Sequence, residues 1–106
     1  MKKIVIVLFL LLVISSCSSK QEIMPESALN VNIENFAFSP NIIKIKAGDI
    51  VTWANNDDAP HTVKGKEFDS GTLNKNQEYK YTFSQSGTYE YICNFHTSMR
   101  GKIIVE

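Results

Sequence analysis

Four side chains of types that bind soft or borderline metal ions stand at positions from which they could share one site. Cys93, His96 and Met99 follow one another with two residues between each pair, and His61 lies upstream of them. A thiolate, two imidazoles and a thioether are the donors of a blue-copper electron-transfer site, because sulfur favours Cu(I) and imidazole suits both oxidation states. The donor set therefore predicts a redox-active copper centre.

Each of these residues, taken singly, has a more ordinary interpretation. A lone Cys is most often a small buried hydrophobic residue, and a single Met or His most often packs in a core or a loop. Zinc would prefer an imidazole, a thiolate, a carboxylate or water to the thioether, and calcium and magnesium need oxygen ligands. It is the combination of all four donors in one short chain that favours copper.

The same residues are compatible with a second chemistry, a thiol hydrolase in which Cys93 is the nucleophile and His61 or His96 is the base. We expect Cys93 to face inward at the end of a strand, with no helix N-terminus to lower its pKa. No further residue clearly orients either histidine. We therefore expect no enzymatic activity.

The segments that must position the donors have the two-residue periodicity of β-strands. In the first of them, Phe36 and Phe38 follow Val31 and Ile33 after a shift of one residue, which predicts a β-bulge. Strands that recur about every 8–12 residues, with turn signals between them, predict an all-β sandwich or barrel. The expected strand segments are 31–38, 43–47, 51–53, 79–83, 89–93 and 103–105.

The N-terminal residues have the layout of an export signal. Two lysines precede an unbroken apolar segment over residues 4–14, which is too short for a membrane span of about 20 residues. Ser15, Ser16 and Cys17 follow, and they resemble a bacterial lipobox, whose cysteine becomes the lipidated first residue of the mature chain. We therefore expect three parts: a lipoprotein signal peptide over 1–16, a flexible lipid-anchored tether over 17–30, and a folded domain over 31–106.

The charge balance and the cysteine count exclude other classes of protein. The chain has 11 basic and 11 acidic residues and no cluster of Lys or Arg, so we do not expect it to bind a nucleic acid. Its 106 residues leave room for one small domain. With Cys17 lipidated, Cys93 has no partner for an intrachain disulfide, and an unpaired thiol in an exported protein favours a role in metal binding.

Over residues 31–106 the chain resembles cupredoxins of the plastocyanin and amicyanin group. The resemblance is carried by residues 51–53, 56–57, 60–63, 68–71, 87–93, 96, 99, 101 and 103–105. It implies a Greek-key β-sandwich that binds one copper ion, with His61, Cys93 and His96 as equatorial ligands and Met99 as the axial ligand. Similar proteins often have proline directly after the second histidine. This chain has Thr97 there, so we expect a more mobile His96 side of the site.

These features predict a monomeric electron carrier on the extracytoplasmic side of a cell membrane, in the periplasm or on the outer cell surface. We expect its copper to cycle between Cu(II) and Cu(I). The family resemblance implies that the His96 imidazole lies near the surface, so we expect its edge to pass electrons to redox protein partners. An acidic pair, Asp57 and Asp58, is expected to steer a basic partner, and Asn55 or Asn56 to tie the two ligand loops together. We expect an apolar docking patch formed by Ala59, Pro60, Phe95 and Met99.

A lipoprotein that sequesters or delivers copper could use the same four donors. Such a protein often has more methionines, and after cleavage of the signal peptide this chain would retain Met24 and Met99 alone. Tight copper binding and fast electron exchange would distinguish the carrier from the delivery protein.

Overall fold

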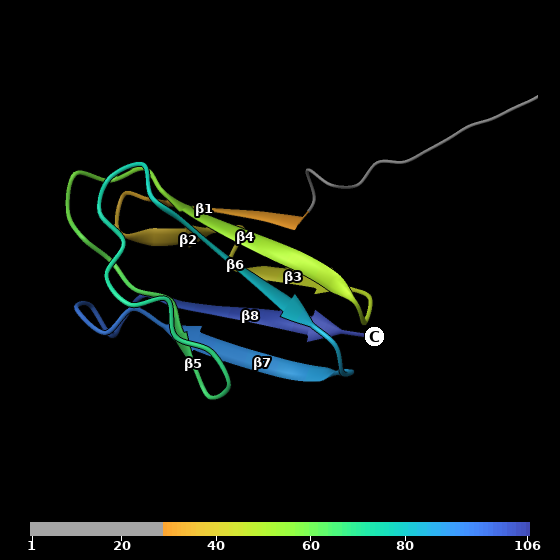
Figure 1. The fold of residues 1–106 in the computed structure, drawn as a ribbon. Helices are drawn as coiled ribbons and strands as arrows, with labels where there is room; N and C mark the ends of the chain where they lie inside the picture. The colour runs from red at the N-terminus through yellow and green to blue at the C-terminus, as the bar shows by residue number, and fades with distance from the viewer. Residues whose placement is uncertain (1–28) are drawn as a thin grey trace, which may run out of the picture.

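The computed structural model describes residues 29–106, which form eight β-strands and no α-helix (Figure 1). Within this part of the chain, no helix is long and apolar enough to cross a membrane. The predicted signal peptide (1–16), Cys17 and almost all of the predicted tether lie outside the described residues. The structure therefore bears on the predicted folded domain.

The strands form two four-stranded sheets that pack face to face (Figure 1). Their bounds are β1 Asn30–Glu34, β2 Ala37–Ser39, β3 Ile42–Ile45, β4 Asp49–Asn55, β5 Lys64–Gly65, β6 Glu78–Phe83, β7 Gly87–Ile92 and β8 Arg100–Val105. One sheet has the order β2-β1-β4-β6 and the other β3-β8-β7-β5. Each sheet has one parallel pair, β1 with β4 and β3 with β8, and its other pairs are antiparallel. The prediction of an all-β sandwich is confirmed.

The alternation of side chains along the strands builds the core between the sheets. On β4, Val51, Trp53 and Asn55 are buried, and the residues between them are partly exposed. The ring of Trp53 lies 5.4 Å from that of Tyr91 on β7 of the other sheet, measured between centroids. Burying a large apolar side chain stabilises the folded state by about 1.5–3 kcal/mol. The core contacts therefore fix the strands from which the loops at the ends of the sheets extend.

The segment between β1 and β2 is a two-residue turn, and the β-bulge predicted here is wrong. Glu34 pairs with Ala37 across the turn, and the loop residues Asn35 and Phe36 have φ angles of 55° and 56°. Two consecutive positive φ angles characterise a type I′ turn, which Asn adopts readily and a bulky aromatic residue rarely. Phe36 therefore points away from the core and is 49% exposed, whereas Phe38 is buried.

Three connections gather at one end of the sandwich, on the left in Figure 1. They are the β1–β2 turn, the loop that follows β4, and the loop from β7 to β8. The loop after β4 carries His61, and the β7–β8 loop carries Cys93, His96 and Met99. The fold thus brings the predicted donors from separate parts of the chain to the same end.

Candidate metal centre

The loop from β7 to β8 is closed by its own backbone hydrogen bonds. The N–H of His96 donates to the carbonyl oxygen of Cys93 (3.3 Å), and that of Met99 to the carbonyl oxygen of His96 (2.8 Å). The N–H of Cys93 donates in turn to the carbonyl oxygen of Met99 (3.2 Å). Because β7 ends just before Cys93 and β8 begins just after Met99, the sheet fixes both ends of the loop. The two-residue spacings of the sequence therefore fold into successive turns that bring His96 back toward Cys93.

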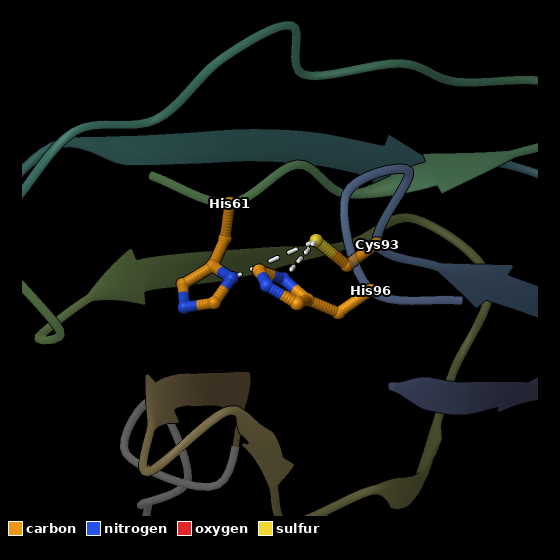
Figure 2. A group of neighbouring side chains, drawn as sticks. All are labelled: His61, Cys93 and His96. Carbon is orange, nitrogen blue, oxygen red and sulfur yellow. Dashed lines mark hydrogen bonds between the residues drawn. The ribbon is translucent and has the colours of Figure 1, made fainter. Parts of the chain in front are cut away.

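The three predicted equatorial donors point toward one another (Figure 2). The Sγ atom of Cys93 lies 3.6 Å from Nδ1 of His61 and 4.0 Å from Nδ1 of His96. All three donor atoms lie within 4.8 Å of one another. Donors that share one ion at about 2.0–2.3 Å, about 120° apart around it, stand about 3.7 Å from each other. The observed distances therefore fit a single metal ion.

The donors differ in their access to solvent. Cys93 and His61 are fully buried, and Met99, the predicted axial residue, is buried on the β7–β8 loop, where its carbonyl oxygen accepts the hydrogen bond from the N–H of Cys93. His96 is partly exposed. Sulfur and imidazole donors in a closed, apolar setting suit copper, whereas a hard cation would require oxygen ligands. The partly exposed imidazole leaves the site open to the surface at one ligand.

The orientation of His61 is set by Asp57. Oδ2 of Asp57 lies 2.8 Å from Nε2 of His61, on the far side of the ring from Cys93. Burial alone would raise the pKa of the Asp57 carboxyl, but hydrogen bonds from Phe36, His61 and Asn35 outweigh it and hold the pKa below its ordinary value. An ionised Asp57 favours a proton on Nε2, so Nδ1 keeps its lone pair for a metal.

Thr62 joins the two ligand loops at the sulfur. Its backbone N–H points at Sγ of Cys93 (3.5 Å), and its Oγ1 accepts a hydrogen bond from the N–H of Asn94 (2.8 Å). The first contact helps to fix the position of the sulfur, and the second bond holds the two loops together. The sequence carries no spacing signal for Thr62, because the contact depends on how the two loops approach each other.

The prediction that Asn55 or Asn56 ties the ligand loops together is wrong. Nδ2 of Asn55 donates to the carbonyl oxygens of Ala59 (2.9 Å) and Leu73 (2.8 Å), and its Oδ1 accepts from the N–H of Asp57 (2.9 Å). Asn55 therefore braces the His61 loop from within. The side chain of Asn56 points instead toward polar side chains of β1, namely Asn32 and Glu34.

The surface around His96 differs from the predicted docking patch. Phe95 is 50% exposed and Pro60 is exposed, but Met99 is buried and contributes no surface. Phe36, which the sequence pattern assigns to a strand, takes part instead. Its ring centroid lies 4.8 Å from that of His96, in an edge-to-face arrangement. An aromatic residue from the β1–β2 turn therefore completes the surface.

The predicted acidic pair also has a different role. Asp57 is occupied by His61 and the β1–β2 turn, so it is not free to steer a partner. Asp58 is exposed and lies 2.7 Å from Nζ of Lys75. The two neighbouring carboxylates therefore differ in function, one belonging to the metal centre and the other to a surface ion pair.

Comparison with known proteins identifies a family model that matches nearly the whole chain and relatives that cover 65–78% of it. The model of the cupredoxin-like domain matches residues 4–105. Amicyanin-alpha of Methylorubrum extorquens is 37% identical over 89 residues, which cover 77% of this chain and 75% of that protein. Amicyanin of Paracoccus versutus is 38% identical over 90 residues, which cover 78% of this chain and 68% of that protein. Plastocyanin of Scenedesmus fuscus is 36% identical over 84 residues, covering 65% of this chain and 86% of that protein.

Solved amicyanin structures have the same fold. A reduced form of one amicyanin mutant and a Cu(I) form of another each give a TM-score of 0.72 at 32% sequence identity. In both cases 78% of this chain and 86% of the solved chain are covered. The cupredoxin family binds one copper ion, and the sulfur and imidazole donors of this chain fit that ion. The resemblance seen in the sequence is thereby confirmed, and the chain belongs to the cupredoxin family.

Proposed function

We propose that this protein is a membrane-tethered type 1 copper electron carrier, with copper bound by His61, Cys93, His96 and Met99. The observation that carries the proposal is the convergence of a buried thiol and two imidazole nitrogens within 4.8 Å. When bound, copper supplies a one-electron couple between Cu(II) and Cu(I). The membership of a blue-copper electron-transfer family supports the same reaction.

The side chains around the site favour electron transfer because they restrict movement. The side chain of His61 is held by Asp57. Cys93 directly follows strand β7, and its sulfur accepts a hydrogen bond from the backbone N–H of Thr62. Donors fixed in this way change their positions little between oxidation states, so little reorganisation accompanies the transfer of an electron.

Electrons enter and leave through His96, because it is the one donor residue of the centre that reaches the surface. Two exposed apolar residues, Phe36 on the β1–β2 turn and Phe95 on the β7–β8 loop, belong to connections that gather at this end of the sandwich. Such a patch suits a weak and short-lived encounter with a redox protein. The fully buried Cys93 is inaccessible to a substrate, which argues against a thiol hydrolase.

Cys17 is the proposed lipid attachment site. The segment from Cys17 to the start of β1 at Asn30 could extend by at most about 45 Å. A tether of that length lets a monomeric domain turn its His96 end toward partners in or near the membrane. The redox partners would therefore share the extracytoplasmic compartment.

Addition of one equivalent of Cu(II) to the purified protein tests the copper site. We expect an intense blue absorption band and a narrow copper hyperfine splitting in the EPR spectrum, as a Cu(II)–thiolate bond produces. Cys93→Ser should lose the blue band and retain the circular dichroism of a β-sandwich. A wild-type protein that stays colourless, or that rapidly loses its copper to weak chelators, would contradict the proposal of an electron carrier.

The lipid anchor needs a separate test. Cells fed a radiolabelled fatty acid should label the wild-type protein and place it in the membrane fraction, and Cys17→Ser should abolish both. An unlabelled wild-type protein would disprove the anchor and leave the copper proposal standing.

A further inference from the structure

Phe36 occupies a backbone position that aromatic residues rarely take. Its φ of 56° follows a φ of 55° at Asn35, so both loop residues of the β1–β2 turn are left-handed. A bulky residue in this region is a real outlier and persists only where its surroundings hold it. Gly or Asn would meet the needs of the turn without strain. The ring of Phe36 therefore has a function that the turn alone does not explain.

The surroundings that hold this turn are part of the metal centre. Oδ1 of Asp57 accepts a hydrogen bond from the N–H of Asn35 (2.7 Å), and Oδ2 accepts one from the N–H of Phe36 (2.9 Å). The same Oδ2 lies 2.8 Å from Nε2 of His61. One carboxylate thus fixes both the orientation of His61 and the position of the Phe36 turn.

The ring of Phe36 contacts both imidazoles of the centre. Its centroid lies 5.1 Å from that of His61 and 4.8 Å from that of His96, with interplanar angles of 87° and 88°. Edge-to-face contacts of this kind are favourable and directional. His61 is already enclosed, so the contact with the partly exposed His96 matters most.

We propose that Phe36 is a positioning residue that covers the metal centre, holding the His96 imidazole in place and slowing the loss of copper. The inference rests on the ligand set of the proposed function. For copper to leave, His96 must swing away from Cys93, since the other donors are buried. The ring of Phe36 packs against the ring of His96. When His96 swings away, either the Phe36 side chain must move or the contact between the two rings is lost.

Transfer of Cu(I) from the holoprotein to a chromogenic Cu(I) chelator measures this function. Phe36→Asn keeps the backbone N–H and suits the left-handed turn, but removes the ring from both imidazoles. We expect this variant to lose Cu(I) about tenfold faster than wild type, the upper end of what the one edge-to-face contact with His96 contributes. Its metal-free form should unfold at the same or a higher urea concentration, because backbone strain is relieved.

Asn35→Gly is the matched control, since it relaxes the neighbouring residue of the same turn and leaves the ring in place. It should release Cu(I) at the wild-type rate. If Phe36→Asn also releases Cu(I) within about twofold of the wild-type rate, the covering role of Phe36 is overturned while the copper site stands. Equal acceleration in both variants would assign the effect to the turn and equally overturn the proposal. A wild-type protein that binds no copper would overturn the proposed function first.

Discussion

Oδ2 of Asp57 lies 2.8 Å from Nε2 of His61, and this contact decides which nitrogen of the imidazole faces Cys93. A carboxylate behind a ligating histidine favours one tautomer and increases the basicity of the other nitrogen. The same carboxylate accepts backbone hydrogen bonds from the β1–β2 turn. The β1–β2 turn therefore stabilises the orientation of His61 through Asp57, although the turn itself supplies no metal ligand.

Asp57→Asn should weaken copper binding about 10–100-fold, because the loss of a partner behind a ligand has effects of that size. The amide keeps the volume of the carboxyl group but loses its charge and one of its two acceptor atoms. The dissociation constant can be measured by competition with a chelator of known affinity. Asp58→Asn is the control, since Asp58 is exposed and pairs only with Lys75 among the contacts of the described chain. Equal losses in the two variants would contradict a specific role for Asp57.

Thr62→Val should loosen the contact between the two ligand loops. Valine has nearly the same shape but lacks Oγ1, so the N–H of Asn94 loses its acceptor. We expect the free energy of unfolding of the metal-free protein to fall by about 1–2 kcal/mol. Urea denaturation measures the change, and Thr52→Val, whose hydroxyl meets Lys80 at the surface, serves as the control. A Thr62 variant as stable as the Thr52 variant would show that the link between the loops adds little.

The regular part of this protein could be predicted because its physical signals are local. Alternation of apolar and polar residues identifies the buried face of each strand, as Val51 and Trp53 illustrate on β4. The spacing of Cys93, His96 and Met99 likewise lies within one short segment. The types of metal-binding atom in this segment can be recognised without knowing the rest of the fold. The structure brings Cys93 and His96 together with His61.

The supporting residues could not be predicted because their roles arise from contacts between distant loops. Phe36 has the residue type of a strand, yet hydrogen bonds to Asp57 stabilise a turn that its intrinsic preference opposes. Asp57 itself looks like part of a solvated acidic pair until the β1–β2 turn is placed beside it. Asn55 and Thr62 both carry suitable polar groups, and only the path of the chain decides which of them reaches the second loop.

Tyr91 should make the stability of the fold depend on alkaline pH. Its ring packs on Trp53 and occupies the space where a Cβ at Gly101 would lie, and burial raises the pKa of Tyr91 to about 12. The folded state therefore favours the neutral phenol. This stabilisation is complete below the pKa of an unfolded tyrosine, about 10, and about 3 kcal/mol is lost as the pH rises through 12.

Urea denaturation of wild type and Tyr91→Phe at a series of alkaline pH values measures this effect. Near neutral pH the two should be similarly stable, because the Tyr91 hydroxyl has no well-formed hydrogen bond among the described residues. As the pH rises above about 10, wild type should lose stability faster than Tyr91→Phe. Tyr89→Phe, which removes a hydroxyl bonded to the carbonyl of Gln85 at the surface, should keep the steep wild-type dependence. Parallel curves for all three proteins would rule out Tyr91 as the source.

Met99→Leu should retain the blue colour and raise the reduction potential. The colour belongs to the bond between copper and the Cys93 thiolate, which the substitution leaves in place. A thioether donates weakly to Cu(II), so its loss disfavours the oxidised state more than the reduced one. Leu fills a similar volume in this buried position, and the fold should be retained. Spectroelectrochemical titration gives the potential, with Met24→Leu in the predicted tether as the control. A Met99→Leu protein that is colourless, or that has the potential of the control, would mean that Met99 is not the axial ligand.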